Sequence, residues 1–244
     1  VFTYFHQPLF LKIPNSSSNF AKLKLKMKTA VINMIKLNTD IWLVQSSFIR
    51  KRLSSKFNID LKNINILPFY PPLIGNSNDS YVRNEGFVYV SNGSQHKNHK
   101  NLIEAFCNYF DEFKRGVLHI TVGEKFPELI ELIANKKSLG YPIVNHGFIN
   151  RDDLINIYQT NEYLIFPSLA ESFGLGLVEA IENGCDVLGA DLPYTYAVCK
   201  PSIVFDPLDV NDIKRAMIES QSTEVKKTEQ LVFNQIDDLI DLLK

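Results

Sequence analysis

Short apolar runs alternate with longer amphipathic stretches along most of the chain. Continuous apolar runs are typical of parallel strands that are covered on both faces, and apolar residues three or four apart indicate helices. Strands are predicted at residues 1–5, 41–44, 63–67, 86–90, 117–122, 143–144, 163–166, 185–189 and 203–207. Helices are predicted at residues 19–37, 46–57, 101–114, 127–137, 152–158, 174–183, 210–220 and 231–243. This alternation predicts an α/β fold with parallel sheets.

Prolines and small polar residues separate two parts of this pattern. The stretch 68–82 contains three prolines followed by Gly75-Asn76-Ser77-Asn78-Asp79-Ser80, which is typical of a linker. We therefore expect one lobe at residues 1–67 and a second at residues 83–224, with a terminal amphipathic helix within 225–244 that packs back on the first lobe. The first part shows only half of a βαβαβ rhythm and begins inside an apolar run. We expect the first lobe to be only partly present and the start of the protein to lie further upstream.

Charge divides in the same way, while the overall composition is unremarkable for a globular protein. Residues 1–65 carry eleven Lys and Arg against two Asp, a net +9, and the remainder carries a net −10. The three cysteines are widely spaced, without the spacing of metal ligands, and are expected to be reduced packing residues in the cytosol. No apolar run approaches the length of a membrane span. The acidic second part disfavours nucleic-acid binding.

The most informative stretch runs from Pro167 to Gly184. Pro167 ends a predicted strand, Gly174 and Gly176 open a helix, and Gly184 suits a left-handed C-terminal cap. A helix N-terminus with glycines beside it exposes backbone N–H groups to a phosphate. Glu171 precedes this helix and Glu179 lies inside it, five residues past Gly174 and roughly 7–8 Å along the axis. Such a pair of glutamates alone is more often a pair of solvated charges than a binding site.

In its full context, the stretch Pro167-Ser168-Leu169-Ala170-Glu171-Ser172-Phe173-Gly174-Leu175-Gly176-Leu177-Val178-Glu179-Ala180 resembles a known motif. It is similar to the donor-binding motif of retaining glycosyltransferases with the GT-B fold, of the family 4 type (glycosyl transferases group 1), as found in the synthesis of bacterial polysaccharide, O-antigen and capsule. The resemblance implies two Rossmann-like lobes. It implies that Glu171 contacts the transferred sugar and that Glu179 binds the ribose. Phe173, Gly174, Leu175 and Gly176 would bind the donor at the helix start.

Two further loops fit this resemblance. Residues 91–101 follow a predicted strand and contain His96-Lys97-Asn98-His99, which is similar to the family loop with its diphosphate lysine, here Lys97. Taken alone, such a loop is more often a solvated basic loop than a diphosphate site. Many members carry an arginine five residues before that lysine, where this chain has Asn92. The turn at Gly147-Phe148-Ile149 resembles the place where the nucleobase is received, with core packing of Phe148 and Ile149 as the alternative.

The first part offers a histidine and a basic helix. His6 ends the first predicted strand, where the family often places a histidine facing the donor sugar, and Gln7 follows where many members are acidic. A structural role for His6 is the alternative. Lysines alternate with apolar residues at Lys22, Lys24, Lys26 and Lys28. They predict either a solvated helix face or a surface for anionic lipid headgroups or a lipid diphosphate acceptor.

The resemblance implies a retaining hexosyltransferase or related glycosyltransferase. It would move a sugar from a UDP- or GDP-sugar to a saccharide or lipid-linked acceptor, with Glu171, His6 and Lys97 at the reaction centre. No metal and no cofactor other than the donor are expected. A cytoplasmic enzyme is expected, with peripheral contact to an anionic membrane as a further option. The alternatives are a non-catalytic sugar-nucleotide-binding lobe and another GT-B enzyme, such as a sugar-nucleotide epimerase.

Overall fold

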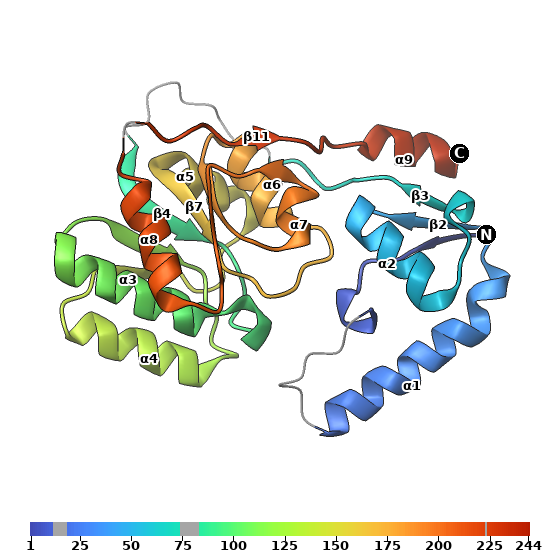
Figure 1. Cartoon of the computed structure of the whole chain (residues 1–244), viewed down its shortest axis with the longest axis horizontal. Coiled ribbons are helices and arrows are strands. Elements are labelled where there is room, and N and C mark those ends of the chain that lie inside the picture. Colours follow the sequence, from blue (N-terminus) through green and yellow to red (C-terminus); the bar gives the residue numbers. More distant parts are fainter. Residues whose placement is uncertain (12–18, 74–82, 223) are drawn as a thin grey trace. The chain divides into compact units, whose positions relative to one another are not determined.

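The structure is a computed structural model that describes residues 1–11, 19–73, 83–222 and 224–244 (Figure 1). By its internal contacts, the chain divides into two compact units. Unit 1 comprises Val1–Pro71, Ala170–Phe173 and Val232–Lys244, and unit 2 comprises Pro72–Leu169 and Gly174–Leu231. The change of unit at Pro71 lies within the stretch predicted as a linker, of which residues 74–82 are outside the described residues.

Unit 1 is built on a three-stranded parallel sheet in the order β1-β2-β3. The strands are β1 (Phe2–Tyr4), β2 (Ile41–Val44) and β3 (Ile64–Ile66). The helices are α1 (Asn19–Ile35), α2 (Ser47–Phe57) and α9 (Ile236–Leu243), with short 3-10 helices at Pro8–Phe10, Lys36–Asn38 and Leu61–Asn63. The predicted strands and the first two predicted helices of this part are confirmed.

Apolar residues of β2 and α2 form the core of unit 1. Its buried members are Phe5, Trp42, Val44, Ile49, Leu53, Phe57 and Ile64. Helix α2 starts at a side-chain cap, because Ser46 Oγ accepts a hydrogen bond from the Ile49 amide at 3.3 Å. It ends at Asn58, which has the left-handed conformation that closes many helices. The sequence therefore marks both ends of the helix that covers this sheet.

Unit 2 contains a six-stranded, fully parallel sheet in the order β10-β8-β7-β4-β5-β6. The strands are β4 (Asn84–Tyr89), β5 (Val117–Ile120), β6 (Ile143–Asn145), β7 (Asn161–Phe166), β8 (Asp186–Ala190) and β10 (Ile203–Phe205). Counted from β6, the order is β6-β5-β4-β7-β8-β10, so β4, the first strand of this unit, lies third. The chain adds β5 and β6 on one side of β4 and then β7, β8 and β10 on the other side. This is the strand order of a Rossmann fold, and it confirms the predicted α/β class.

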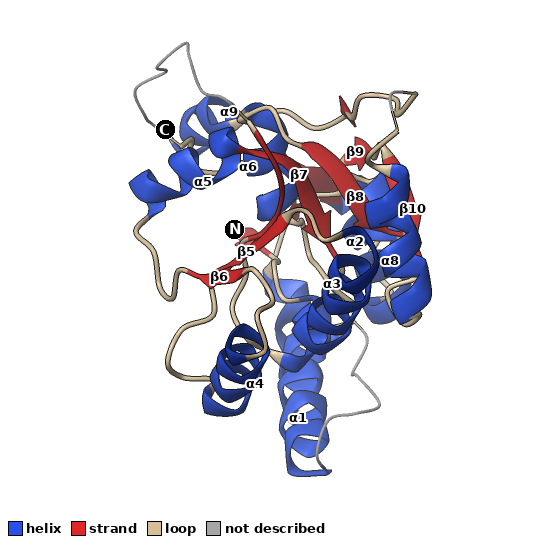
Figure 2. Cartoon of the chain, turned by 90° about the vertical axis from the view of Figure 1, so that its left-hand side faces the viewer, coloured by secondary structure: helices blue, strands red, loops and turns tan. Residues whose placement is uncertain are grey.

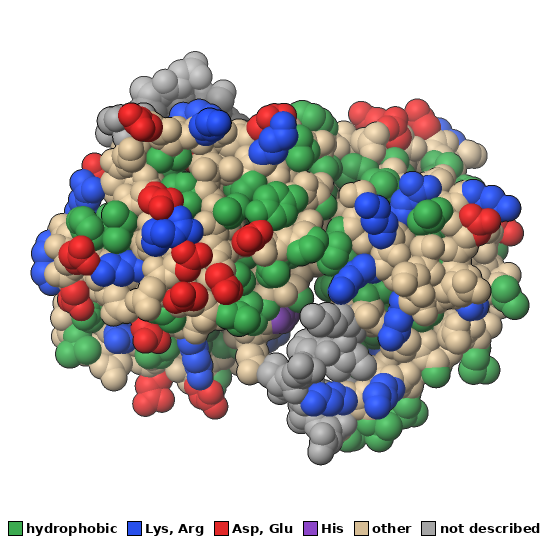
Figure 3. Space-filling model, in the orientation of Figure 1, with side chains coloured by type: hydrophobic (Ala, Val, Ile, Leu, Met, Phe, Trp, Pro, Cys, Tyr) green, Lys and Arg blue, Asp and Glu red, His purple; other side chains and the backbone are tan. Residues whose placement is uncertain are grey.

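Helices cover both faces of this sheet (Figures 1 and 2). They are α3 (His99–Phe113), α4 (Pro127–Ser138), α5 (Leu154–Thr160), α6 (Leu175–Glu182), α7 (Pro193–Tyr196) and α8 (Val210–Glu219). Helix α3 packs against α4 and α8, whereas α5 and α6 pack on the central strands. Acidic and basic side chains mix over α3 and α8 (Figure 3), where Lys214 pairs with Glu112 at 2.5 Å.

The C-terminal segment departs from the expected helix 231–243. Helix α9 begins at Ile236, five residues later than the apolar pattern predicts. The preceding residues are extended, because β11 (Glu229–Gln230) pairs antiparallel with β9 (Cys199–Lys200) and the Leu231 amide donates to the Val198 carbonyl at 2.9 Å. Backbone pairing thus overrides the helical period at Leu231, and this part of the prediction is wrong.

Candidate functional site

The candidate site lies at the carboxyl ends of β4 and β7 in unit 2. These strands are neighbours, but the chain leaves β4 toward β5 and β6, whereas it leaves β7 toward β8 and β10. In open parallel sheets, ligands bind in the crevice at such a reversal of strand order. The two loops that leave β4 and β7 are therefore positioned to supply ligand-binding groups.

The loop after β4 is held by hydrogen bonds to its backbone and by hydrogen bonds from its Asn98 side chain to other loops. It contains the 3-10 helix Gln95–Lys97, and Tyr89 Oη donates to the Lys97 carbonyl at 3.0 Å. Asn98 follows in the left-handed conformation and is buried. Its Nδ2 donates to the carbonyls of Pro207, at 2.6 Å, and Pro167, at 3.3 Å. This anchoring holds the backbone at Lys97, whose side chain is half-buried.

The loop after β7 is joined directly to the loop after β4. The Leu169 amide donates to the His96 carbonyl at 2.7 Å. On the other side, Tyr194 Oη donates to the Ser168 carbonyl at 2.6 Å. These bonds connect the residue preceding Lys97 with the loop that leads into α6. The structure therefore brings together the loop at residues 91–101 and the stretch that begins at Pro167, which the sequence identifies independently of each other.

Gly174 is the N-cap of helix α6 and has a φ of +85°, a conformation that glycine adopts without strain. Gly176 lies close to the sheet, because a Cβ atom added there would lie 3.2 Å from Phe166 Cε2 and 3.7 Å from the Val90 carbonyl oxygen. The first amides of α6, at Leu175 and Gly176, have no acceptor within the helix by the geometry of an α-helix. An eight-residue helix with such a start offers N–H groups and a positive dipole end to an anion.

Glu179 lies about one turn into α6 with its carboxylate buried, at 4% exposure. Arg151 Nη2 lies 2.8 Å from Glu179 Oε1, and Tyr158 Oη donates to Oε2 at 3.4 Å. Burial raises the pKa of Glu179, and the guanidinium of Arg151 opposes that rise. The predicted ribose ligand is thus held by two partners. The sequence identified neither as a partner, although a buried carboxylate requires them.

The turn after β6 presents an aromatic ring to solvent. Gly147 has a φ of +69°, and the Phe148 side chain is 89% exposed. Asn145 holds the turn, because its Oδ1 accepts from the Val122 amide at 2.8 Å and the Gly147 amide at 3.2 Å. Core packing of Phe148, the alternative drawn from the sequence, is wrong. A rigid turn with an exposed ring is compatible with stacking on a planar ligand.

Two histidines near the ends of β5 and β6 form a pair that the sequence did not predict. His119 Nδ1 lies 3.0 Å from His146 Nε2, and the rings are stacked with centroids 5.2 Å apart. Burial lowers the pKa of His119 to about 4 and also lowers the pKa of His146. Both rings are therefore neutral at pH 7, and one donates to the other.

The remaining predicted residues belong to unit 1. His6 is exposed after β1 and its ring stacks on Tyr4, with centroids 5.3 Å apart. Glu171 and Phe173 lie in Ala170–Phe173, and the Phe173 ring is buried against Tyr70, with centroids 5.8 Å apart. In unit 1, Ser46 Oγ also donates to the Ser172 carbonyl at 3.3 Å. The segment that carries Glu171 is thus held by residues of unit 1.

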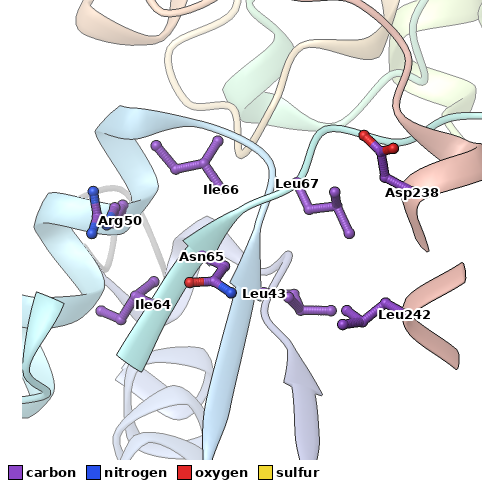
Figure 4. A pocket seen from close by; sticks show the side chains of 8 residues that line it. All are labelled: Leu43, Arg50, Ile64, Asn65, Ile66, Leu67, Asp238 and Leu242. Atoms are coloured by element: carbon purple, nitrogen blue, oxygen red, sulfur yellow. The ribbon is translucent and has the colours of Figure 1, made fainter. Parts of the chain in front are cut away.

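Unit 1 also has a hollow of about 380 Å³ between β2, β3, α2 and α9 (Figure 4). Aliphatic side chains dominate its lining, which consists of Leu43, Arg50, Ile64, Asn65, Ile66, Leu67, Asp238 and Leu242. None of the predicted site residues lines it. Across the described ranges, no three His, Cys, Asp or Glu side chains are grouped so that they could hold a metal ion. No helix in the described part of the chain has the length and apolar character to cross a membrane.

The strand order defines a Rossmann-type α/β unit, and the joined loops form a candidate ligand site at the switch point of its sheet. The chain belongs to the glycosyl transferases group 1 family, whose sequence model matches residues 74–234. It is 32% identical over 133 residues to the serotype-specific mannosyltransferase WbdA of Escherichia coli, covering 52% of this chain and 16% of WbdA. It is 28% identical over 137 residues to the lipopolysaccharide glucosyltransferase WaaG of Escherichia coli strain K12, covering 53% of this chain and 34% of WaaG.

The chain thus spans about a sixth of WbdA and about a third of WaaG. Among solved structures, HepE from Anabaena in complex with UDP and glucose superimposes with a TM-score of 0.70 at 13% identity. That match covers 91% of this chain and 62% of HepE. Together with the parallel sheets, the structural relatives confirm the predicted GT-B fold class.

Proposed function

We propose that this chain is a glycosyltransferase, or the donor-binding part of one, that uses a nucleoside-diphosphate sugar. The observation that carries the proposal is the junction of two loops at the switch point of the sheet. The Leu169–His96 hydrogen bond of 2.7 Å places the Lys97 loop beside the loop that opens α6. The ammonium group of Lys97 and the N-terminus of α6, on two loops connected in this way, are suited to bind a diphosphate.

Each predicted residue takes one role in this proposal. Lys97 and the first amides of α6 bind the diphosphate and stabilise the charge of the leaving group. Glu179 accepts hydrogen bonds from the ribose, and Phe148 lies in the turn that receives the base. Glu171 orients the transferred sugar, and His6 contributes to the same step. The acceptor is a saccharide or a lipid-linked saccharide, and the anomeric configuration is retained, as the family resemblance implies.

Nucleotide affinity tests the role of Lys97. We expect Lys97→Gln to weaken binding of UDP or GDP by about 10–100-fold, because a charge-assisted hydrogen bond contributes about 1.5–3 kcal/mol. Lys100→Gln is the matched control, since Lys100 is an exposed lysine three residues further along. Calorimetric titration of UDP, GDP and ADP into the chain and both variants gives the result. Equal affinities for both variants would show that Lys97 does not bind the nucleotide.

Turnover separates catalysis from the other candidates. Incubation of a bound donor with saccharide acceptors, followed by mass spectrometry, detects transfer, and proton NMR of the product gives its anomeric configuration. Binding without transfer or hydrolysis would favour a non-catalytic donor-binding lobe. A changed sugar on an intact nucleotide would favour an epimerase. We also propose that no metal is required, so that addition of EDTA leaves transfer unchanged.

We further propose that α1 contacts an anionic membrane from the cytoplasmic side. Lys24, Lys26 and Lys28 are exposed on this helix, whereas Lys22 is half-buried. Exposed apolar residues recur every three or four positions and form a stripe between these lysines, made of Phe20, Leu23, Met27, Val31 and Met34. An apolar stripe flanked by lysines is typical of helices that lie in a membrane interface. No acidic residue precedes Asp40 in the chain.

Sedimentation with lipid vesicles tests this contact. We expect the chain to bind vesicles that contain phosphatidylglycerol more strongly than vesicles of phosphatidylcholine alone. Replacing Lys24, Lys26 and Lys28 with Gln removes three charges and should abolish the preference, since each basic residue near such a surface contributes about 1 kcal/mol. Replacing the exposed Lys125, Lys137 and Lys226 of unit 2 is the matched control. Equal binding of both triple variants would contradict the contact.

A further inference from the structure

An ion pair between a partly exposed arginine and a buried glutamate connects the turn at Phe148 to the predicted ribose ligand in unit 2. Arg151 opens the 3-10 helix Arg151–Asp153, three residues after Phe148, and its guanidinium pairs with Glu179 at 2.8 Å. The two residues are distant in sequence and meet only in the folded unit. Removing one partner of such a pair leaves the other charge buried without compensation.

We propose that Arg151 is a positioning residue for the nucleoside, which keeps Glu179 ionised and aimed so that it can accept hydrogen bonds from the ribose. This inference rests on the proposed function, because it assigns a task to the same donor site. Arg151 acts through Glu179 and is not itself placed in contact with the ligand.

The two protein partners do not use up the hydrogen-bond acceptor capacity of the Glu179 carboxylate. Arg151 contacts Oε1 and Tyr158 contacts Oε2, so each oxygen has one protein partner from among the described contacts. A carboxylate oxygen has two lone pairs, and a second acceptor position therefore stays available on each oxygen. Two neighbouring hydroxyl groups of a ribose need two such acceptors. The pair of partners thus fixes the direction of the carboxylate without using all of its capacity.

The charge balance makes Arg151 the decisive partner. Burial raises the pKa of Glu179, and Glu182 on the same helix raises it further. Arg151 and the Tyr158 hydroxyl lower the pKa, with Arg151 the stronger of the two. Without Arg151, burial is largely unopposed and Glu179 takes up a proton at higher pH. A protonated carboxyl has a donor on one oxygen and is a weaker acceptor, so it is poorly suited to hold two hydroxyl groups.

The test is the pH dependence of nucleotide affinity. For the unaltered chain, we expect the affinity for UDP or GDP to change little between pH 6 and pH 9. For Arg151→Gln, we expect a loss of about 10-fold or more at pH 6, because protonation of a ligand-binding carboxylate removes a charged hydrogen bond. The affinity should recover to within about 3-fold at pH 9, where Glu179 is again ionised. Glu179→Gln should bind weakly at every pH.

Three controls sharpen the result. Arg151→Lys keeps the charge without the planar guanidinium and should keep the pH profile of the unaltered chain. Lys137→Gln removes an exposed positive charge from α4 and should change nothing. The 2′-deoxy form of the same nucleotide lacks one hydroxyl, so its affinity should depend less on pH in Arg151→Gln.

The outcomes separate the inference from the proposed function. If the unaltered chain binds none of UDP, GDP and ADP, the proposed function fails. If it binds a nucleotide, but Arg151→Gln loses the same factor at pH 6 and pH 9, Arg151 has only a structural role and the inference alone fails. Tighter binding by Arg151→Gln at all pH values would show that the guanidinium competes with the ligand, and would also overturn the inference.

Discussion

At the scale of single residues, burial fixes the charge of two histidines in unit 2. Burial lowers the pKa of His99 to about 3 and that of His119 to about 4. In the unfolded chain both should titrate near pH 6.5. Between these values, the unfolded state binds more protons than the folded state, so the free energy of unfolding falls as the pH falls from about 6.5 to 4.

This fall in the free energy of unfolding at acid pH leads to a prediction for the His119–His146 pair. We expect His119→Gln to reduce the acid loss of stability by about 1–2 kcal/mol, because one pKa unit corresponds to about 1.4 kcal/mol and the site is only partly buried. Urea unfolding at pH 7, 5.5 and 4.5 measures the effect. His6→Gln, an exposed histidine of unit 1, is the control and should keep the full acid loss. An unchanged slope in His119→Gln would contradict the assignment.

Local pattern predicted the placement of site residues better than it predicted their partners. Lys97 follows a strand and Glu179 lies inside a helix, and both positions can be derived from the residues near them. The Arg151–Glu179 ion pair depends on how the 3-10 helix Arg151–Asp153 lies against α6, which no local pattern encodes. The exposed ring of Phe148 was equally unpredictable, because an aromatic residue after a strand is compatible with core packing or exposure.

At the scale of elements, α6 can lie close to β7 because Gly176 has no side chain. A Cβ atom there would lie 3.2 Å from Phe166 Cε2, and the larger valine would push the start of α6 away from β7. We expect Gly176→Val to lower stability by about 1–3 kcal/mol, as overpacking does, and to weaken nucleotide binding. Gly123→Val is the matched control, because no atom lies within 4 Å of a Cβ atom built at Gly123.

Thermal unfolding and calorimetric titration measure the two effects of Gly176→Val. A variant that is destabilised but binds nucleotide with unchanged affinity would show that the start of α6 does not hold the ligand. Equal destabilisation by Gly123→Val would show that loss of glycine, and not the close approach to Phe166, is responsible.

Most elements could be predicted because their ends carry chemical signals. Ser46 before α2 and Gly174 before α6 mark helix starts that the structure confirms. The pairing of β9 with β11 could not be predicted, since each strand has only two residues and their register depends on segments far apart in sequence. The same pairing explains why Leu231 is extended although it continues the apolar period of α9.

At the scale of the whole molecule, the segment Ala170–Phe173 groups with unit 1, although both of its neighbours in sequence belong to unit 2. No hydrophobic pattern predicts this grouping, because it arises from contacts with distant residues. Its ties within unit 1 include the ring of Tyr70 on Phe173, at 5.8 Å, and the hydroxyl of Ser46 on Ser172, at 3.3 Å. The proposed sugar ligand Glu171 thus belongs to unit 1, whereas the proposed nucleotide ligands Lys97 and Glu179 belong to unit 2.

This division predicts that a change in unit 1 can alter transfer while nucleotide binding is preserved. Tyr70 is 2% exposed, and Tyr70→Leu removes the aromatic partner of Phe173 while keeping an apolar side chain. We expect sugar transfer to fall by about 10-fold or more, because small displacements of a positioning group are costly in the transition state. The affinity for UDP or GDP should change by less than about 3-fold, since its proposed ligands lie in unit 2.

Tyr70→Phe keeps the ring and should transfer sugar at close to the original rate. Circular dichroism and thermal unfolding establish that both variants are folded, because a smaller buried side chain also lowers stability. A loss of nucleotide affinity equal to the loss of transfer in Tyr70→Leu would mean that the segment serves the nucleotide and not the sugar. Unchanged transfer would mean that Glu171 does not depend on the contacts of unit 1 for its position. A selective loss of transfer would assign the two halves of the donor motif to separate tasks, with sugar positioning held by unit 1 and nucleotide binding by unit 2.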